Sequence, residues 1–88
     1  MATDICILLG RRIRRLRKAR GWTQIDLAVA MLPEQNQNYI SVIERGATDI
    51  TARMAERVAN GLGVDIGELF INLAAEELVV KPKSRKPR

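Results

Sequence analysis

The sequence TQIDLAVAMLPEQNQNYISVIERG, residues 23–46, carries the pattern that determines the fold. Apolar residues recur at steps of three and four on both sides of Pro33, as is typical of two short amphipathic helices. Proline disfavours helical torsions in the residue before it, so it separates the two helices. We therefore predict a helix over Gln24–Met31, a turn over 32–35 and a second helix over 37–45.

The ends of these two predicted helices carry residue types that helix ends favour. Thr23, followed three residues later by Asp26, resembles a capping box, and Asn36 is a suitable N-cap for the second helix. Gly46 closes that helix, because a residue without a Cβ tolerates left-handed torsions. The local signals thus agree with the apolar periodicity.

Further helices are predicted on both sides of this pair. Residues 4–20 place isoleucine and leucine side chains on one face, and Gly21 ends that helix. A fourth helix is predicted over 52–62 and a fifth from Ile66, each preceded by a residue suited to capping. The expected fold is all-α, a compact five-helix bundle that contains a helix-turn-helix.

The C-terminal residues leave several structures open. Residues 71–80 could extend the fifth helix, form a sixth, or end in a short strand at Leu78–Val80. The tail 81–88 holds five basic residues and two prolines, a composition that we expect to be disordered. We therefore predict one domain over 1–80, with a dimerisation extension at its end, followed by a disordered basic tail.

Charge is divided unevenly along the chain, whose formal net charge is +5. Residues 1–46 hold eight basic and four acidic side chains, and residues 47–80 hold two basic and six acidic ones. The tail 81–88 adds five basic residues and no acidic one. A basic front half and tail fit a polyanionic partner such as nucleic acid, although the same charges would also suit a solvated surface.

Other classes of protein are disfavoured by what the sequence lacks. There is no histidine, and Cys6 is the only cysteine, so no intrachain disulfide can form. Its apolar neighbours favour a buried Cys6 over a reactive thiol. The adjacent Glu76 and Glu77 would point about 100° apart on a helix, unlike a catalytic carboxylate pair. With no apolar run near the roughly 20 residues of a membrane span, we expect a cytoplasmic protein without enzyme activity, metal or cofactor.

Three segments together resemble the Xre/Cro-type helix-turn-helix family of bacterial and phage regulators. They are IRRLRKARGWTQIDLA (13–28), YISVIERG (39–46) and RVANGLGVDIGELF (57–70). Short members of this family include restriction–modification controller proteins and phage repressors. The resemblance implies a homodimeric regulator that binds double-stranded DNA at a palindromic or pseudo-palindromic operator, with a recognition helix at 36–45 in the major groove.

The same resemblance, together with the chemistry of the side chains, assigns roles to particular residues. Carboxamides can bond both N6 and N7 of adenine. Base contacts are expected from Asn36, Gln37, Asn38 and Ser41. Phosphate contacts are expected from Arg17, Lys18, Thr23, Gln24, Tyr39 and Arg45, with Arg20 as a further candidate. Glu44 and Trp22 are expected to serve the fold, and Arg11 or Arg12 to be solvated or paired with acids of residues 47–80.

A homodimer is expected through the fifth helix and its extension, which carry more apolar surface than so small a monomer can cover. The residues assigned to that interface are Ile66, Leu69, Phe70 and Leu73. An alternative function is an antitoxin-like protein-interaction module that binds another protein through residues 71–88 and autoregulates its operon. A third alternative, an enzyme, is disfavoured by the missing histidine and the lack of convergent carboxylates.

Overall fold

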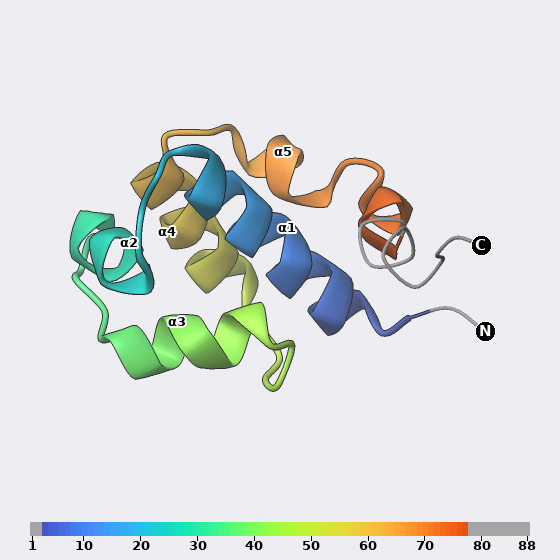
Figure 1. The fold of residues 1–88 in the computed structure, drawn as a ribbon, viewed down its shortest axis with the longest axis horizontal. Coiled ribbons are helices and arrows are strands. Elements are labelled where there is room, and N and C mark those ends of the chain that lie inside the picture. The colour runs from blue at the N-terminus through green and yellow to red at the C-terminus, as the bar shows by residue number, and fades with distance from the viewer. Residues whose placement is uncertain (1–2, 78–88) are drawn as a thin grey trace, which may run out of the picture.

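Figure 1 shows the chain, for which the computed structural model describes residues 3–77. The helices in chain order are α1 (Ile5–Ala19), α2 (Gln24–Ala30), α3 (Gln37–Glu44), α4 (Ala52–Leu62) and α5 (Ile66–Phe70), followed by the 3₁₀ helix η1 (Leu73–Glu77). The described range contains no strand, so the predicted all-α, five-helix fold is confirmed. Helix α1 crosses the middle of the molecule, with α3 along its lower side and α2 at one end (Figure 1).

The helix ends follow the local signals closely. The capping box at Thr23 forms, because its hydroxyl accepts from the backbone N–H of Asp26 while that carboxylate accepts from the N–H of Thr23. Helix α2 ends one residue earlier than predicted, since Met31 turns to extended torsions and its side chain is completely buried. Gly21 adopts a φ of 72° after α1, as the sequence indicated.

The core contains side chains from all five α-helices. Its members are Leu9, Ile13, Leu27, Ala28, Met31, Ile40, Ile43, Ala55, Val58, Ala59, Leu62 and Leu69. Helix α1 lies directly against α3 at Gly10, where an added Cβ would lie 2.5 Å from the carbonyl oxygen of Ile43. A glycine is needed there because a real Cβ does not approach an oxygen so closely, and it lets α3 lie directly against α1.

The segment after α5 forms a separate short helix. Asn72 has a left-handed φ of 51°, which breaks the chain direction between α5 and η1. The residues of η1 then pack back onto α1, so a short sixth helix is the outcome among those that the sequence left open. The strand considered as one alternative at Leu78–Val80 and the predicted disordered tail 81–88 lie outside the described residues.

Candidate nucleic-acid interface

The exposed side of α3 brings together side chains that were predicted to read bases. Gln37, Asn38 and Ser41 fall within about 100° of the helix circumference, since successive residues turn by about 100°. Arg45, predicted to contact phosphate, caps the end of α3. Gln37 and Asn38 are exposed, Ser41 is partly buried, and Ile40 is buried on the other side of the helix. The start of α3 therefore presents two carboxamides and a hydroxyl to a ligand.

Asn36, the fourth predicted base-reading residue, caps α3. Its Oδ1 accepts a hydrogen bond from the backbone N–H of Tyr39 at 2.9 Å, so the oxygen is directed at the helix end. A bidentate contact with adenine uses both the oxygen and the nitrogen of a carboxamide. Gln37 and Asn38 are consequently better placed than Asn36 for such a contact.

A chain of hydrogen bonds connects Gln37 to the interior. Glu44 is buried, and its Oε1 accepts from Nε2 of Gln24 at 3.1 Å. The Oε1 of Gln24 in turn accepts from Nε2 of Gln37 at 3.3 Å. Because a carboxylate only accepts hydrogen bonds, it sets the amide orientation of Gln24, and the oxygen of Gln24 then faces Gln37. The oxygen of Gln37 and its second N–H remain available to a ligand.

Arg17 lies inside the molecule rather than at its surface. Only 6% of the residue is exposed. Its Nε and Nη2 donate to the two carboxylate oxygens of Glu44 at 2.7 and 2.9 Å, and its Nη1 donates to the carbonyl of Trp22 at 2.7 Å. The hydrogen bonds to Glu44 and its negative charge raise the pKa of Arg17. Arg17 therefore has an internal structural role in place of the predicted phosphate contact, because its donors are already in use.

The remaining predicted phosphate ligands differ in solvent exposure and in the hydrogen bonds that they already make. Lys18, Thr23 and Arg45 are exposed, while Gln24 and Tyr39 are partly buried. The Nε of Arg45 donates to the carbonyl of Ser41 at 3.2 Å, which holds the guanidinium along α3. Thr23 uses its hydroxyl oxygen and its backbone N–H in the capping box. Lys18 lies in the last turn of α1, and the other four lie on α2 or α3 or cap their ends.

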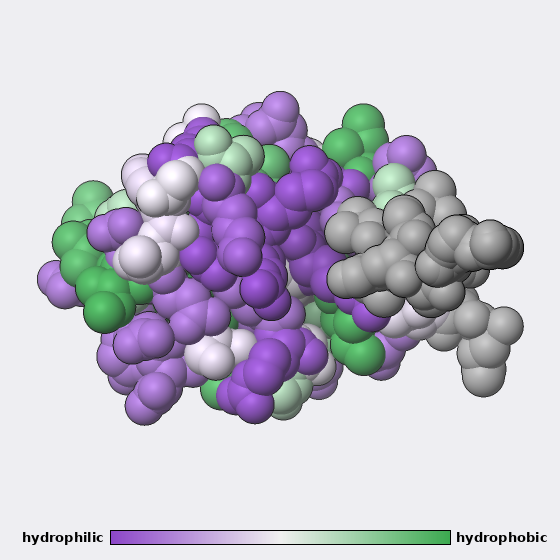
Figure 2. Space-filling view, in the orientation of Figure 1, coloured by the Kyte–Doolittle hydropathy of each residue, from purple (hydrophilic) through white to green (hydrophobic). Residues whose placement is uncertain are grey.

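The basic side chains of α1 differ in whether the fold supplies them with an acidic partner. Arg12 is buried and donates to Glu76, and also to the backbone carbonyls of Glu68 and Asn72. Arg15 also pairs with Glu76, at 2.8 Å. Of the two outcomes left open for Arg12, solvation or pairing with an acid of residues 47–80, the structure shows the pairing. Arg14 and Lys18 are exposed. Figure 2 shows that the surface over α1 is largely hydrophilic.

Trp22 and Arg20 occupy the corner between α1 and α2. Trp22 is partly buried and packs against the core, as expected, and the guanidinium of Arg20 lies 5.9 Å from the centre of its ring. The Nη1 of Arg20 also approaches the carbonyl of Leu16 at 3.5 Å. A cation–π contact at an exposed site contributes about 0.5–1 kcal/mol, so Arg20 is held loosely.

The predicted interface residues divide between surface and core. Ile66 and Phe70 of α5 are 41% and 42% exposed, whereas Leu69 is fully buried. Leu73 is partly buried and packs against the core. Leu69 of α5 and Leu73 at the start of η1 therefore serve the fold of the monomer, because both pack against the core. Ile71, which was not predicted, is 68% exposed.

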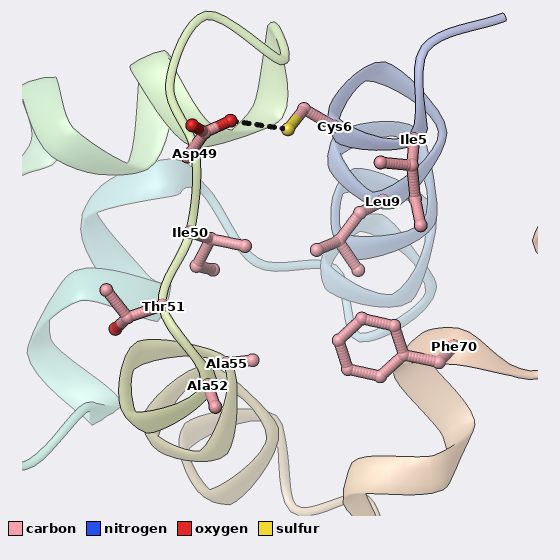
Figure 3. Close-up of a pocket in the computed structure, with 9 residues that line it drawn as sticks. All are labelled: Ile5, Cys6, Leu9, Asp49, Ile50, Thr51, Ala52, Ala55 and Phe70. Atoms are coloured by element: carbon pink, nitrogen blue, oxygen red, sulfur yellow. Dashed lines mark hydrogen bonds between the residues drawn. The ribbon is translucent and has the colours of Figure 1, made fainter.

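Phe70 also lines one side of an apolar groove, shown in Figure 3. The groove has a volume of about 390 Å³. Its walls are Ile5, Cys6 and Leu9 of α1, the segment Asp49–Ala52, Ala55 of α4 and Phe70. Ile5 is 61% exposed at its edge, so apolar surface continues from α5 to the start of α1.

Cys6 stands at the rim of this groove and is partly exposed, rather than buried as predicted. Its Sγ donates to Oδ1 of Asp49 at 3.3 Å (Figure 3). That hydrogen bond, with desolvation and the charge of Asp4, raises the pKa of Cys6 to about 11. The thiol form of Cys6 is therefore favoured over the thiolate. This agrees with the expectation that the sulfur is unreactive.

Two further observations concern residues 3–77 as a whole. No group of histidine, cysteine, aspartate and glutamate side chains in that range has an arrangement that could hold a metal ion. Across the same residues, no helix is both long and apolar enough to cross a membrane.

Sequence reasoning missed the buried position of Glu76. Only 1% of this residue is exposed, and it serves as counter-ion to two arginines of α1. One signal was present: Arg12 lies about 40° from Leu8 and Leu16 on the helix circumference, on the apolar side of α1. A cation at such a position requires a partner from elsewhere in the fold.

The comparisons with known proteins agree with this geometry. Residues 13–69 match the helix-turn-helix family, so the chain belongs to that family. The control protein C.MunI from Mycoplasma sp is 29% identical over 73 residues, which make up 83% of this chain and 97% of that protein. The family consists of DNA-binding regulators, and this chain is accordingly a DNA-binding regulator rather than an enzyme.

Solved structures show the same architecture. The restriction-modification controller protein C.AhdI from Aeromonas hydrophila is 31% identical, with a TM-score of 0.68 over 74% of this chain and 96% of that one. The clp gene regulator ClgR from C. glutamicum is 25% identical, with a TM-score of 0.75 over 90% of this chain and 99% of that one. The expected resemblance to short regulators of the controller type is therefore confirmed.

Proposed function

We propose that this regulator is a homodimer that reads a palindromic or pseudo-palindromic operator, with α3 of each protomer in the major groove. The observation that carries the proposal is the exposed pair Gln37 and Asn38 at the start of a helix whose other side is anchored in the core. Short, rigidly held carboxamides at a helix start are suited to reading base edges. Because its partner is DNA, we place the protein in the cytoplasm.

The base contact assigned to Gln37 follows from the hydrogen-bond chain behind it. With one N–H donated to Gln24, its remaining N–H can donate to N7 of adenine while its oxygen accepts from N6. Asn38 and Ser41 extend the reading surface along α3. Such a bidentate contact is worth about 1–3 kcal/mol of discrimination between bases.

Phosphate contacts by Lys18, Thr23, Gln24, Tyr39 and Arg45 would fix the register of α3 in the groove. Phosphate contacts position a protein without reading sequence. Occupancy of an operator near a promoter would then block or recruit polymerase. The protein-interaction alternative assigns residues 71–88 to a partner protein. The hydrogen bond from Arg12 to Glu76 instead holds residues 71–77 against α1.

The proposed dimer uses the exposed apolar side chains of α5 together with the groove beside them. Ile66 and Phe70 from the prediction are joined by Ile71 and by Ile5 across the groove. A two-fold interface pairs the same patch from both copies, so these side chains would cover one another. Such a dimer would place two α3 helices about 34 Å apart, one turn of DNA.

Selection from a random-sequence duplex library tests the reading of an operator. The expected result is an inverted repeat whose half-sites lie about one helical turn apart, about 10 base pairs. Gln37→Ala should then lose roughly 5- to 150-fold in affinity for that repeat, corresponding to about 1–3 kcal/mol, and little for random DNA.

Gln35→Ala is the matched control, because Gln35 lies in the turn before α3 and its amide donates to the carbonyl of Pro33. This variant should bind the repeat like the parent protein. Equal losses on the repeat and on random DNA for Gln37→Ala would refute base reading by this residue. A library without any enriched repeat would refute the operator itself.

A further inference from the structure

Three cations of α1, namely Arg11, Arg14 and Lys18, have no carboxylate within ion-pair distance in the part of the chain that the structure describes. Arg14 and Lys18 are exposed, and Arg11 is partly exposed. The other arginines inside α1 are paired with buried glutamates. We refer to Arg11, Arg14 and Lys18 as the α1 cation stripe.

The stripe begins at the contact between α1 and α3. Gly10, Arg14 and Lys18 are spaced by four residues and therefore lie in one row along the helix. Gly10 faces α3, because a Cβ there would meet the carbonyl oxygen of Ile43 at 2.5 Å. Arg14 and Lys18 follow along the same edge, and Figure 2 shows hydrophilic side chains covering this face of the molecule.

The stripe is also held firmly relative to the reading surface. Arg17, three residues after Arg14 on α1, donates two hydrogen bonds to Glu44 of α3. Helix α1 thus carries both the stripe and the anchor of α3, and the two surfaces form one unit. The backbone that carries these cations is therefore already ordered, so that only their side chains have to be fixed on binding.

The length of the stripe matches the spacing of a nucleic-acid backbone. Arg11 and Lys18 are seven residues apart, which corresponds to about 10 Å along the helix at about 1.5 Å per residue. Phosphates on one DNA strand recur about every 3.4 Å of the duplex axis. Three side chains over that length can therefore each meet a different phosphate.

We propose that the α1 cation stripe binds backbone phosphates of the duplex whose major groove receives α3. The DNA contact of each protomer then extends beyond the helix-turn-helix and onto the solvent face of α1. This inference rests on the proposed function, because α3 brings the duplex to the protein. It adds Arg11 and Arg14 to the DNA-binding residues.

The test compares neighbouring arginines that differ in their partners. Arg14→Gln and Arg15→Gln each remove one charge, but Arg15 is 52% exposed at its side chain and already paired with Glu76. Affinity for the selected operator and for a random duplex is measured by fluorescence anisotropy between about 50 and 200 mM salt. A triple variant, Arg11→Gln with Arg14→Gln and Lys18→Gln, removes the whole stripe.

Each lost phosphate contact should reduce the slope of log affinity against log salt by about 0.9. We expect that change for Arg14→Gln, about three times that change for the triple variant, and none for Arg15→Gln. The affinity ratio of parent to triple variant should then shrink about 40-fold from the lowest to the highest salt. Operator preference should persist in all variants, because α3 is unchanged.

Two results would refute phosphate binding by the α1 cation stripe while leaving the proposed function intact. In the first, the triple variant keeps the parent slope and still selects the operator. In the second, Arg14→Gln and Arg15→Gln change the slope equally, which would show that only net charge matters. A parent protein that binds no DNA would overturn the stripe and the proposed function together. Circular dichroism of each variant confirms that it is folded.

Discussion

Replacing Glu76 with glutamine tests the ion-pair cluster that fastens η1 to α1. In the parent protein the carboxylate, 1% exposed at its side chain, receives hydrogen bonds from Arg12 and Arg15. The side chain of Arg12 is itself only 6% exposed. Glutamine keeps the shape but removes the charge, so Arg12 remains buried without a counter-ion.

The expected loss is about 3–5 kcal/mol of unfolding free energy, the cost of removing one partner of a buried pair. A domain of this size has a total of roughly 4–13 kcal/mol, at about 0.05–0.15 kcal/mol per residue. Arg15→Gln, by contrast, removes a half-exposed partner and should cost at most about 1 kcal/mol. The double variant Arg12→Met with Glu76→Leu should recover much of the loss, because apolar side chains need no counter-ion.

Urea unfolding followed by circular dichroism measures these differences. Burial alone would raise the pKa of Glu76, but hydrogen bonds from Arg15 and Arg12 outweigh it and lower that pKa. A carboxyl group with a lower pKa in the folded state stabilises above its unfolded pKa, and this contribution is lost as pH falls through the folded pKa. Glu76→Gln should therefore lose less stability on acidification than the parent. A glutamine variant as stable as the parent at neutral pH would refute the reasoning.

Three further predictions follow from packing and from the thiol. Phe70→Glu should convert the proposed dimer to a folded monomer in size-exclusion chromatography with light scattering, and an unaltered dimer would show that α5 is not in the interface. Leu69→Ala should instead cost about 2–5 kcal/mol of stability, because Leu69 is fully buried. Gly10→Val should lower the melting temperature and weaken operator binding together, since its Cβ would lie 2.5 Å from the carbonyl oxygen of Ile43; an unchanged melting temperature would contradict that close contact. Cys6, with its pKa raised to about 11, should be alkylated by iodoacetamide at pH 8 more slowly than a free cysteine, and an equal rate would show that the thiol is not protected.

Helices and their ends were predictable because the interactions that form them are local. The capping bonds of Thr23 and Asn36 join residues three positions apart, and the left-handed Gly21 follows directly on α1. The exposed face of α3 also followed from helical spacing alone. The departure at Met31 is small and has a tertiary cause, since its side chain leaves the helix to fill the core.

The partners of the charged residues were not predictable in the same way. Arg17 meets Glu44 across 27 residues, and Arg12 meets Glu76 across 64. Periodicity did not distinguish buried Arg17 from exposed Lys18, or buried Leu69 from exposed Phe70. Neighbouring positions on a short helix differ in burial only once another helix lies against one of them. The sequence alone was sufficient for the helices, their caps and the family of DNA-binding regulators. Which cations face inward, which leucines leave the surface and which amide orients Gln37 depend on how α1, α3 and η1 pack, since only packing brings distant charges together and removes water from between them.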